Sequence, residues 1–263
     1  MKQTILTTQQ STLLENLIVK HGQIVTTDNI YIQANEWWDQ KTTKNIITKL
    51  TNNGWLIRIK RGLYAISDLS NRGFLSLSPY LVAHLLVNDS YVSFETALSY
   101  HGMFDQLTHK VISIAPMQYK TLQLQEVEYS FVKAKKDWYF GWQEANIDNK
   151  ATRIATPEKA LIDMVQFHKS KYSIDVVVEK IKQHKDSLDS VKMTEYLRKM
   201  SMTTIKIFGL LFDIVGFDSS KLFALLKSKS GTHTMLSESV KFNAKWRLYY
   251  DPYFDKYQDT DAI

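Results

Sequence analysis

The sequence predicts an α+β protein with two domains. An N-terminal winged helix-turn-helix of residues 1–70 is followed by a mixed domain of residues 71–263 with a small sheet and a helical bundle. The length of 263 residues exceeds one average domain. Helical and strand periodicities both occur, and the first seventy residues run helix, helix, helix, β-hairpin. The segment 69–78, LSNRGFLSLS, is rich in small polar residues and places the boundary near residue 70.

Two helices are expected before the first long connection. Thr7 and Thr8 can cap the first, whose apolar residues share one face until Gly22 ends it. Ile24 and Val25 form a short extended piece, and residues 26–28 then cap a second helix. Tryptophans in this region are expected in the core or at its edge rather than as platforms for base stacking: Trp37, Trp38 and Trp55.

A third helix is expected from about Lys41, followed by a β-hairpin. The inward residues of the helix recur at i, i+3, i+4 and i+7: Thr43, Ile46, Ile47 and Leu50. Its other face mixes cations with short hydrogen-bonding side chains: Lys41, Thr42, Lys44, Asn45, Thr48 and Lys49. Residues 55–60 alternate with period two, and Arg61-Gly62 turns the chain back into a partner strand over 63–66.

The positive charge of the chain is concentrated in this region. The chain has 33 Lys and Arg against 27 Asp and Glu, an excess of six. Residues 41–61 contain no acid and supply six cations: Lys41, Lys44, Lys49, Arg58, Lys60 and Arg61. We therefore expect double-stranded DNA as the partner, with the third helix in the major groove and the hairpin on phosphates. The alternatives are a winged helix that docks onto a protein and a solvated basic face.

The second domain is expected to begin with helices and strands and to end as a bundle. Helix starts are expected at Pro79, Ser93 and Thr156-Pro157. Strands are expected at 111–115, 126–134 and 138–142, and residues 148–150 are expected to turn into the segment 151–155. Helical stripes follow at 174–181, 191–197, 205–215 and 222–226. The aromatic end returns to strand, and packing is favoured over a partner surface for its rings: Trp246, Tyr249, Tyr250, Tyr253 and Phe254.

No enzyme, cofactor or metal site is expected. The absence of Cys removes disulfides, thiolate zinc sites and thiol nucleophiles, and the seven His lack metal-ligand spacing. No nucleophile elbow or phosphate-binding loop occurs. The groups nearest to a nuclease site are expected to be solvated charges: Glu126, Glu128 and Lys133, or Asp148 and Lys150. Glu158 is expected at a helix start and Asp163 on the surface. A dispersed nuclease or toxin-modifying site remains an alternative.

Composition also predicts where the protein works. No stretch approaches 18 consecutive apolar residues, so no transmembrane helix is expected. The first twenty residues lack the apolar run and the cleavage site of a signal peptide. The absence of Cys fits a reducing compartment. The expectation is a cytoplasmic protein with no membrane partner.

Five segments occur in a shared order over nearly the whole chain: KLTNNGWLIRIKRGLYAI (49–66), YVSFETALSYHGM (91–103), VISIA (111–115), ATPEKALIDMV (155–165) and KFNAKWRLYY (241–250). Together they resemble the AbiEi-type antitoxins of bacterial abortive-infection (type IV) toxin–antitoxin systems. The resemblance implies a winged helix that binds inverted repeats upstream of its own operon and represses it. It also implies a C-terminal domain that opposes a cognate nucleotidyltransferase-like toxin.

By the same resemblance, the DNA contacts would fall on the third helix and on the hairpin: Lys41, Thr42, Lys44, Asn45, Lys49, Arg58, Lys60 and Arg61. The connection of residues 34–40 departs from the family pattern, because it is long and rich in tryptophan. Solitary regulators share this pair of domains, so a transcriptional regulator without a toxin partner is a further alternative.

Overall fold

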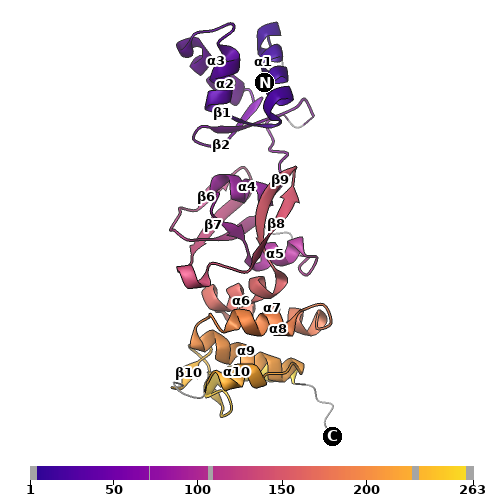
Figure 1. Ribbon diagram of the computed structural model, residues 1–263, viewed down its shortest axis with the longest axis vertical. Helices are drawn as coiled ribbons and strands as arrows, with labels where there is room; N and C mark the ends of the chain where they lie inside the picture. Colours follow the sequence, from indigo (N-terminus) through magenta and orange to yellow (C-terminus); the bar gives the residue numbers. More distant parts are fainter. Residues whose placement is uncertain (1–4, 71, 106–108, 227–230, 259–263) are drawn as a thin grey trace. The chain divides into compact units, whose positions relative to one another are not determined.

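The computed structural model describes residues 5–70, 72–105, 109–226 and 231–258, and it shows an α+β protein. The chain divides into two compact units, Met1–Asn88 with Gln123–Val127, and Asp89–Leu122 with Glu128–Ile263. The first unit therefore continues beyond residue 70 and includes helix α4 (Pro79–Leu86). Figure 1 shows the order of the elements along the chain.

The first unit begins with three helices and a short strand: α1 (Thr8–His21), β1 (Ile24–Thr26), α2 (Thr27–Ala34) and α3 (Gln40–Asn52). Thr7 and Thr26 form capping boxes with the residues three positions on, Gln10 and Asn29, which fixes where α1 and α2 start. Gly22 ends α1 with a φ of 74°. These helices match the sequence expectation closely.

Two further strands complete the first unit's sheet, β2 (Leu56–Lys60) and β3 (Leu63–Ile66). The strand order is β1-β3-β2, and both pairings are antiparallel. Gly62 has a φ of 80° in the turn, a value that an L side chain adopts only with strain. The register of β2 on β3 shifts between Arg58 and Lys60, which inserts one additional residue, Ile59, into β2.

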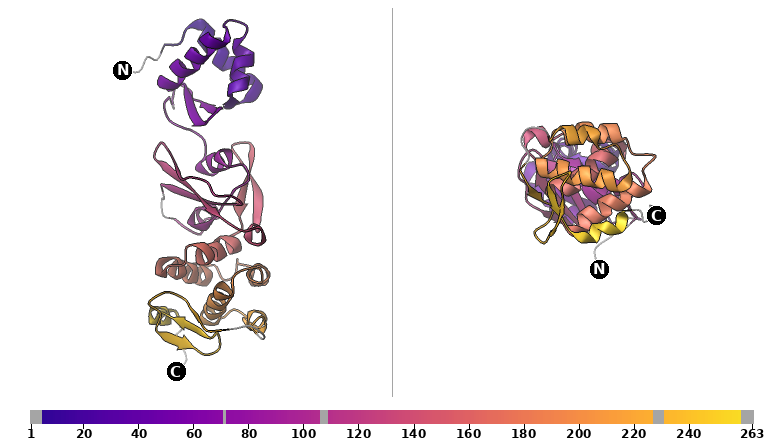
Figure 2. Two further views of the ribbon diagram at one scale, coloured as in Figure 1. Left: turned by 90° about the vertical axis from the view of Figure 1, so that its left-hand side faces the viewer. Right: turned by 90° about the horizontal axis from the view of Figure 1, so that it is seen from below.

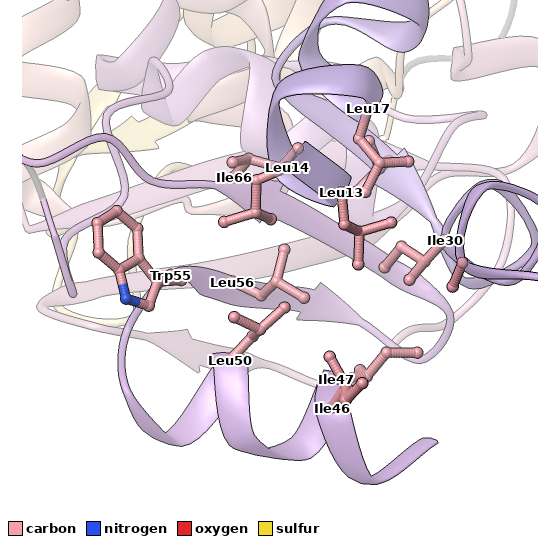
Figure 3. Close-up of a cluster of buried hydrophobic side chains, with 12 residues drawn as sticks. Leu13, Leu14, Leu17, Ile30, Ile46, Ile47, Leu50, Trp55, Leu56 and Ile66 are labelled. Atoms are coloured by element: carbon pink, nitrogen blue, oxygen red, sulfur yellow. The ribbon is translucent and has the colours of Figure 1, made fainter. Parts of the chain in front are cut away.

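The core of the first unit lies between the three helices and one face of this sheet. Figure 3 shows its buried side chains, to which α1, α2, α3, β2 and β3 all contribute. Leu56 belongs to this cluster, whereas Ile57 and Ile59 are buried outside it. Because successive strand residues face opposite sides, these two isoleucines mark a second packed face of β2. Helix α4 contacts β2.

A six-stranded mixed sheet in the order β6-β7-β5-β4-β9-β8 belongs to the second unit, except for residues 123–127 of β6, β7 and their connection, which are grouped with the first unit. Its strands are β4 (Tyr91–Val92), β5 (Lys110–Ala115), β6 (Leu122–Leu124), β7 (Val127–Lys133), β8 (Trp142–Ile147) and β9 (Lys150–Ala155). The two-residue β4 lies inside the sheet, antiparallel to β5 and parallel to β9. Asp148 and Asn149 form the turn between β8 and β9, both with positive φ.

Helices follow or flank this sheet: α5 (Phe94–Tyr100), α6 (Pro157–Phe167), α7 (Lys171–Gln183), α8 (Ser190–Leu197), α9 (Met202–Val215) and α10 (Ser220–Ala224). Helix α6 is the central one, because it contacts α5, α7, α8, α9 and β9. A small sheet of β10 (His233–Thr234), β12 (Leu248–Tyr250) and β11 (Lys241–Asn243) lies beside α9 and α10 (Figures 1 and 2). The segment Pro252–Tyr257 is a 3₁₀ helix.

The expected strand at 138–142 is wrong. Trp138 ends a 3₁₀ turn (Lys136–Trp138), and its indole Nε1 donates a hydrogen bond to the Lys199 carbonyl 2.9 Å away. Gly141 has a φ of 79°, and a Cβ at this position would lie 2.8 Å from Cγ of Lys159. These tertiary contacts override the strand propensity of the aromatic residues, and β8 begins only at Trp142.

Candidate nucleic-acid interface

Helix α3 separates its apolar and polar residues onto opposite faces. Thr43, Ile46, Ile47 and Leu50 are buried. The remaining predicted residues of the helix are exposed: Lys41, Thr42, Lys44, Asn45, Thr48 and Lys49. Because they recur at helical spacing, they form one continuous surface, which we call the α3 face. The hairpin residues Arg58 and Arg61 are exposed as well.

The α3 face begins at a cap that the sequence reasoning missed. Asp39 accepts a hydrogen bond from the Thr42 backbone N–H at 2.8 Å and starts α3 at Gln40. Hydrogen bonds from the Thr42 side chain and backbone lower the pKa of Asp39. Thr42 is therefore part of the helix cap. Asp39 places a carboxylate at the first turn of α3, where the helix dipole stabilises negative charge.

The cations of this surface have no counter-ion in the described part of the chain. Within residues 5–70, 72–105, 109–226 and 231–258, no ion pair or side-chain hydrogen bond involves these five side chains: Lys41, Lys44, Lys49, Arg58 and Arg61. Two lysines of the second unit differ, since Lys241 lies 2.8 Å from Asp255 and Lys245 lies 2.7 Å from Asp213. The five unneutralised cations make the α3 face and the hairpin attractive to a polyanion.

Lys60 is placed differently from the other cations. It is half-buried, and its Nζ donates a hydrogen bond to the Leu86 carbonyl, 3.3 Å away at the end of α4. The neighbouring turn residue Gly62 accepts a hydrogen bond from the Thr27 N–H at 2.9 Å. The end of the hairpin is thus fixed to α2 and to α4, and Arg61 lies exposed between the two attachments.

The short polar side chains of the α3 face differ in what they can offer. Thr48 donates its hydroxyl to the Lys44 carbonyl at 3.0 Å and retains only its acceptor capacity. The Asn45 side chain has no hydrogen bond in the part of the chain that the structure describes. An amide on an exposed helix face can pair bidentately with adenine N6 and N7, so Asn45 is the best-placed side chain for reading a base.

The tryptophans of the first unit pack as expected. Trp55 is buried in the core, and Trp37 and Trp38 are half-buried against it with their ring centroids 5.7 Å apart. The guanidinium of Arg72 lies 5.7 Å from the centroid of the Trp55 ring. The three rings therefore lie in the core or at its edge.

The candidate nuclease residues do not gather into one site. Glu128 pairs with Lys110 at 2.9 Å, and Asp148 lies in the β8–β9 turn with a φ of 51°. Among the residues that the structure describes, no group of three or more His, Asp or Glu side chains is placed to hold a metal ion.

A buried ion pair in α6 corrects the expected surface position of Asp163. Asp163 and Lys159 are both fully buried, and the Lys159 ammonium bonds the Asp163 carboxylate. Asp163 also accepts hydrogen bonds from the Ser93 hydroxyl at 2.7 Å and the Tyr91 hydroxyl at 3.3 Å. Burial raises the pKa of Asp163 and lowers that of Lys159, although each partner's charge opposes the shift.

Glu158 starts α6 as expected, but it is buried rather than solvated. Its carboxylate lies 3.0 Å from Lys192 Nζ and accepts a hydrogen bond from the Asp189 N–H at 3.3 Å. The C-terminal aromatics divide into two groups. Buried side chains are Trp246, Tyr250 and Phe254, whereas Tyr249 and Tyr253 are exposed. The expected packing therefore holds for three of the five rings.

Comparisons with known proteins bear on the fold. Neither a family model nor a curated protein matches the chain. A crystal structure of the Rv2827c protein from Mycobacterium tuberculosis is similar, with a TM-score of 0.67 and 15% sequence identity. The similarity covers 94% of this chain and 92% of that chain. At this identity the likeness shows the fold alone. Throughout the described ranges, every helix is too short or too polar to cross a lipid bilayer.

Proposed function

We propose that the first unit is a winged helix-turn-helix that binds double-stranded DNA, with α3 as the recognition helix and the β2–β3 hairpin as the wing. The five cations without counter-ions carry this proposal. They occupy the polar side of α3 and the hairpin, the two elements that contact DNA in such folds. A protein-docking module needs no such surface.

In this arrangement the contacts divide by chemistry. Lys41, Lys44 and Lys49 bind phosphates or guanine edges, while Asn45 reads adenine in the major groove. Arg58 and Arg61 bind phosphate from the wing. Five neutralised phosphates correspond to a slope of about −4.5 for log K against log salt.

We further propose that the protein represses its own operon and acts as an antitoxin against a nucleotidyltransferase-like toxin. The five motif segments and their order support this part. If the adjacent reading frame encodes a nucleotidyltransferase that arrests growth, co-expression with this protein should restore growth. Growth that stays arrested on co-expression would refute the antitoxin role and favour a solitary transcriptional regulator.

DNA binding can be tested with the full-length protein and fluorescently labelled duplexes. The duplex from the upstream region should bind more tightly than a scrambled duplex of equal composition. Replacing Lys44 and Lys49 together by Gln should reduce the magnitude of the salt slope by about 1.8, since each lost phosphate contact removes about 0.9. Asn45→Ala should instead reduce discrimination at one base pair by about 1–3 kcal/mol.

The matched control removes two lysines that already have carboxylate partners, Lys241→Gln with Lys245→Gln. This double variant should bind with the wild-type slope. Binding that does not depend on salt, or equal affinity for the upstream and scrambled duplexes, would refute the proposed function.

A further inference from the structure

The wing is attached to two helices on either side of its exposed turn residue. On one side the Gly62 carbonyl accepts from the first N–H of α2, Thr27, at 2.9 Å. On the other side Lys60 Nζ donates to the Leu86 carbonyl at 3.3 Å. Arg61, between them, has no side-chain partner in the described ranges. Two adjacent cations of the hairpin thus have different environments.

The register shift in β2 explains why Lys60 turns toward α4. Simple alternation would place Lys60 on the same face as Leu56 and Arg58. The additional residue Ile59 changes the direction of the side chains that follow it, as β-bulges do. Ile57 and Ile59 are buried outside the three-helix core, and α4 contacts β2. Lys60 therefore continues the contact between the second face of β2 and α4.

The acceptor of Lys60 is a group that has no other partner among the residues that the structure describes. The last four carbonyls of a helix have no intrahelical donor, and the Leu86 carbonyl belongs to this set in α4. No glycine follows α4 to form a left-handed cap, since the C-cap is Val87 with a φ of −136°. A lysine ammonium satisfies the carbonyl and stabilises the negative end of the helix dipole. Moving Lys60 to a phosphate would break this hydrogen bond.

We propose that Lys60 is a positioning residue that fastens the wing to α4 and makes no phosphate contact, so that Arg61 is the cation the turn presents to DNA. Helix α4 then belongs to the DNA-binding module, which extends to residue 88. This inference rests on the proposed DNA binding for the role of Arg61, whereas the attachment of Lys60 to α4 is independent of it.

The test compares three full-length variants on a mixed-sequence duplex of about 30 base pairs: Lys60→Met, Arg61→Met and Lys60→Arg. Arg61→Met should reduce the magnitude of the salt slope by about 0.9. Lys60→Met should keep the wild-type slope, and its binding should weaken equally at every salt concentration. Lys60→Arg retains the charge and the donor, so it should bind DNA with the wild-type affinity.

Hydrogen exchange of the amides in the last turn of α4 gives a second readout that needs no DNA. Lys60→Met should speed exchange about 2- to 10-fold, the effect of one lost hydrogen bond, while Arg61→Met should not. Unchanged exchange in Lys60→Met, or a slope that falls as it does in Arg61→Met, would overturn the inference. If no lysine or arginine variant alters the slope, the proposed function fails, and the exchange data still decide where Lys60 binds.

Discussion

Removing the charge of Asp163 should destabilise the second unit strongly. Asp163→Asn keeps the side-chain shape and the oxygen that accepts from Ser93 and Tyr91, but it loses the charge and the second oxygen, which accepts from Lys159. The Lys159 ammonium would then be fully buried without a counter-ion. Breaking a buried ion pair in this way costs about 3–5 kcal/mol. This is a large fraction of the free energy of unfolding of an ordinary domain, about 5–15 kcal/mol.

A second substitution separates electrostatics from packing. Lys159→Met combined with Asp163→Asn removes both charges and keeps an amide oxygen that can accept from Ser93. The double variant should therefore be more stable than Asp163→Asn alone, because no uncompensated charge remains. The loss of unfolding free energy in Asp163→Asn should also become smaller as the pH rises above neutral. Burial lowers the pKa of Lys159, so the native state holds fewer protons than the unfolded chain and gains stability with rising pH.

Urea unfolding followed by circular dichroism measures these differences, and hydrogen exchange of the α6 amides locates them in the second unit. A loss below about 1 kcal/mol for Asp163→Asn would refute the reasoning, because a well-solvated pair has a value of that size. Lys159→Met alone completes the comparison, and a double variant whose loss of stability equals the sum of the losses in the two single variants would refute the coupling.

Three further predictions concern single residues. An ideal Cβ on Gly209 would lie 2.3 Å from the Trp246 ring, so Gly209→Ala should lower the free energy of unfolding by about 1–3 kcal/mol in urea titrations. Gly62→Ala should cost about 1–2 kcal/mol in the same titration, because φ is 80°; an unchanged midpoint would show that the turn rearranges. Burial alone would raise the pKa of Glu158, but hydrogen bonds, including that from Lys192, outweigh it and lower the pKa below 4.5. Its contribution to stability is therefore present above pH 4.5 and lost as the pH falls through the native pKa. In Glu158→Gln the free energy of unfolding should therefore fall less steeply with decreasing pH in this range.

Local signals in the sequence were sufficient for most of the first unit. Capping threonines, a terminal glycine and helical spacing predict α1 and α2, and the apolar stripe of α3 separates its buried and exposed residues correctly. Each of these features is decided within a few residues along the chain. The start of α3 is harder to locate from the sequence, because its cap, Asp39, follows a tryptophan-rich connection that carries no helix-start pattern.

Contacts between distant segments explain the errors. Lys60 looks like an exposed tip residue until α4 supplies its acceptor 26 positions later. Asp163 resembles half of a surface pair with Lys159 at i, i+4, but its partners Tyr91 and Ser93 lie about 70 residues away. The sequence does contain one signal for this burial. The residues between Lys159 and Asp163 (160–162) and the two after Asp163 (164–165) are all apolar, and a helix that is apolar all round is buried.

The short strand β4 has a consequence for synthesis of the protein on the ribosome. Its two residues pair on one side with β5, about twenty positions later, and Val92 pairs on the other side with Ile154 of β9. Sheet closure must therefore wait until the ribosome has passed residue 155, whereas α1–α3 and their hairpin are complete by residue 66. At about 5–20 residues per second, this leaves the nascent chain with unpaired strand edges for several seconds. During that interval the exposed edges are templates on which other chains can pair.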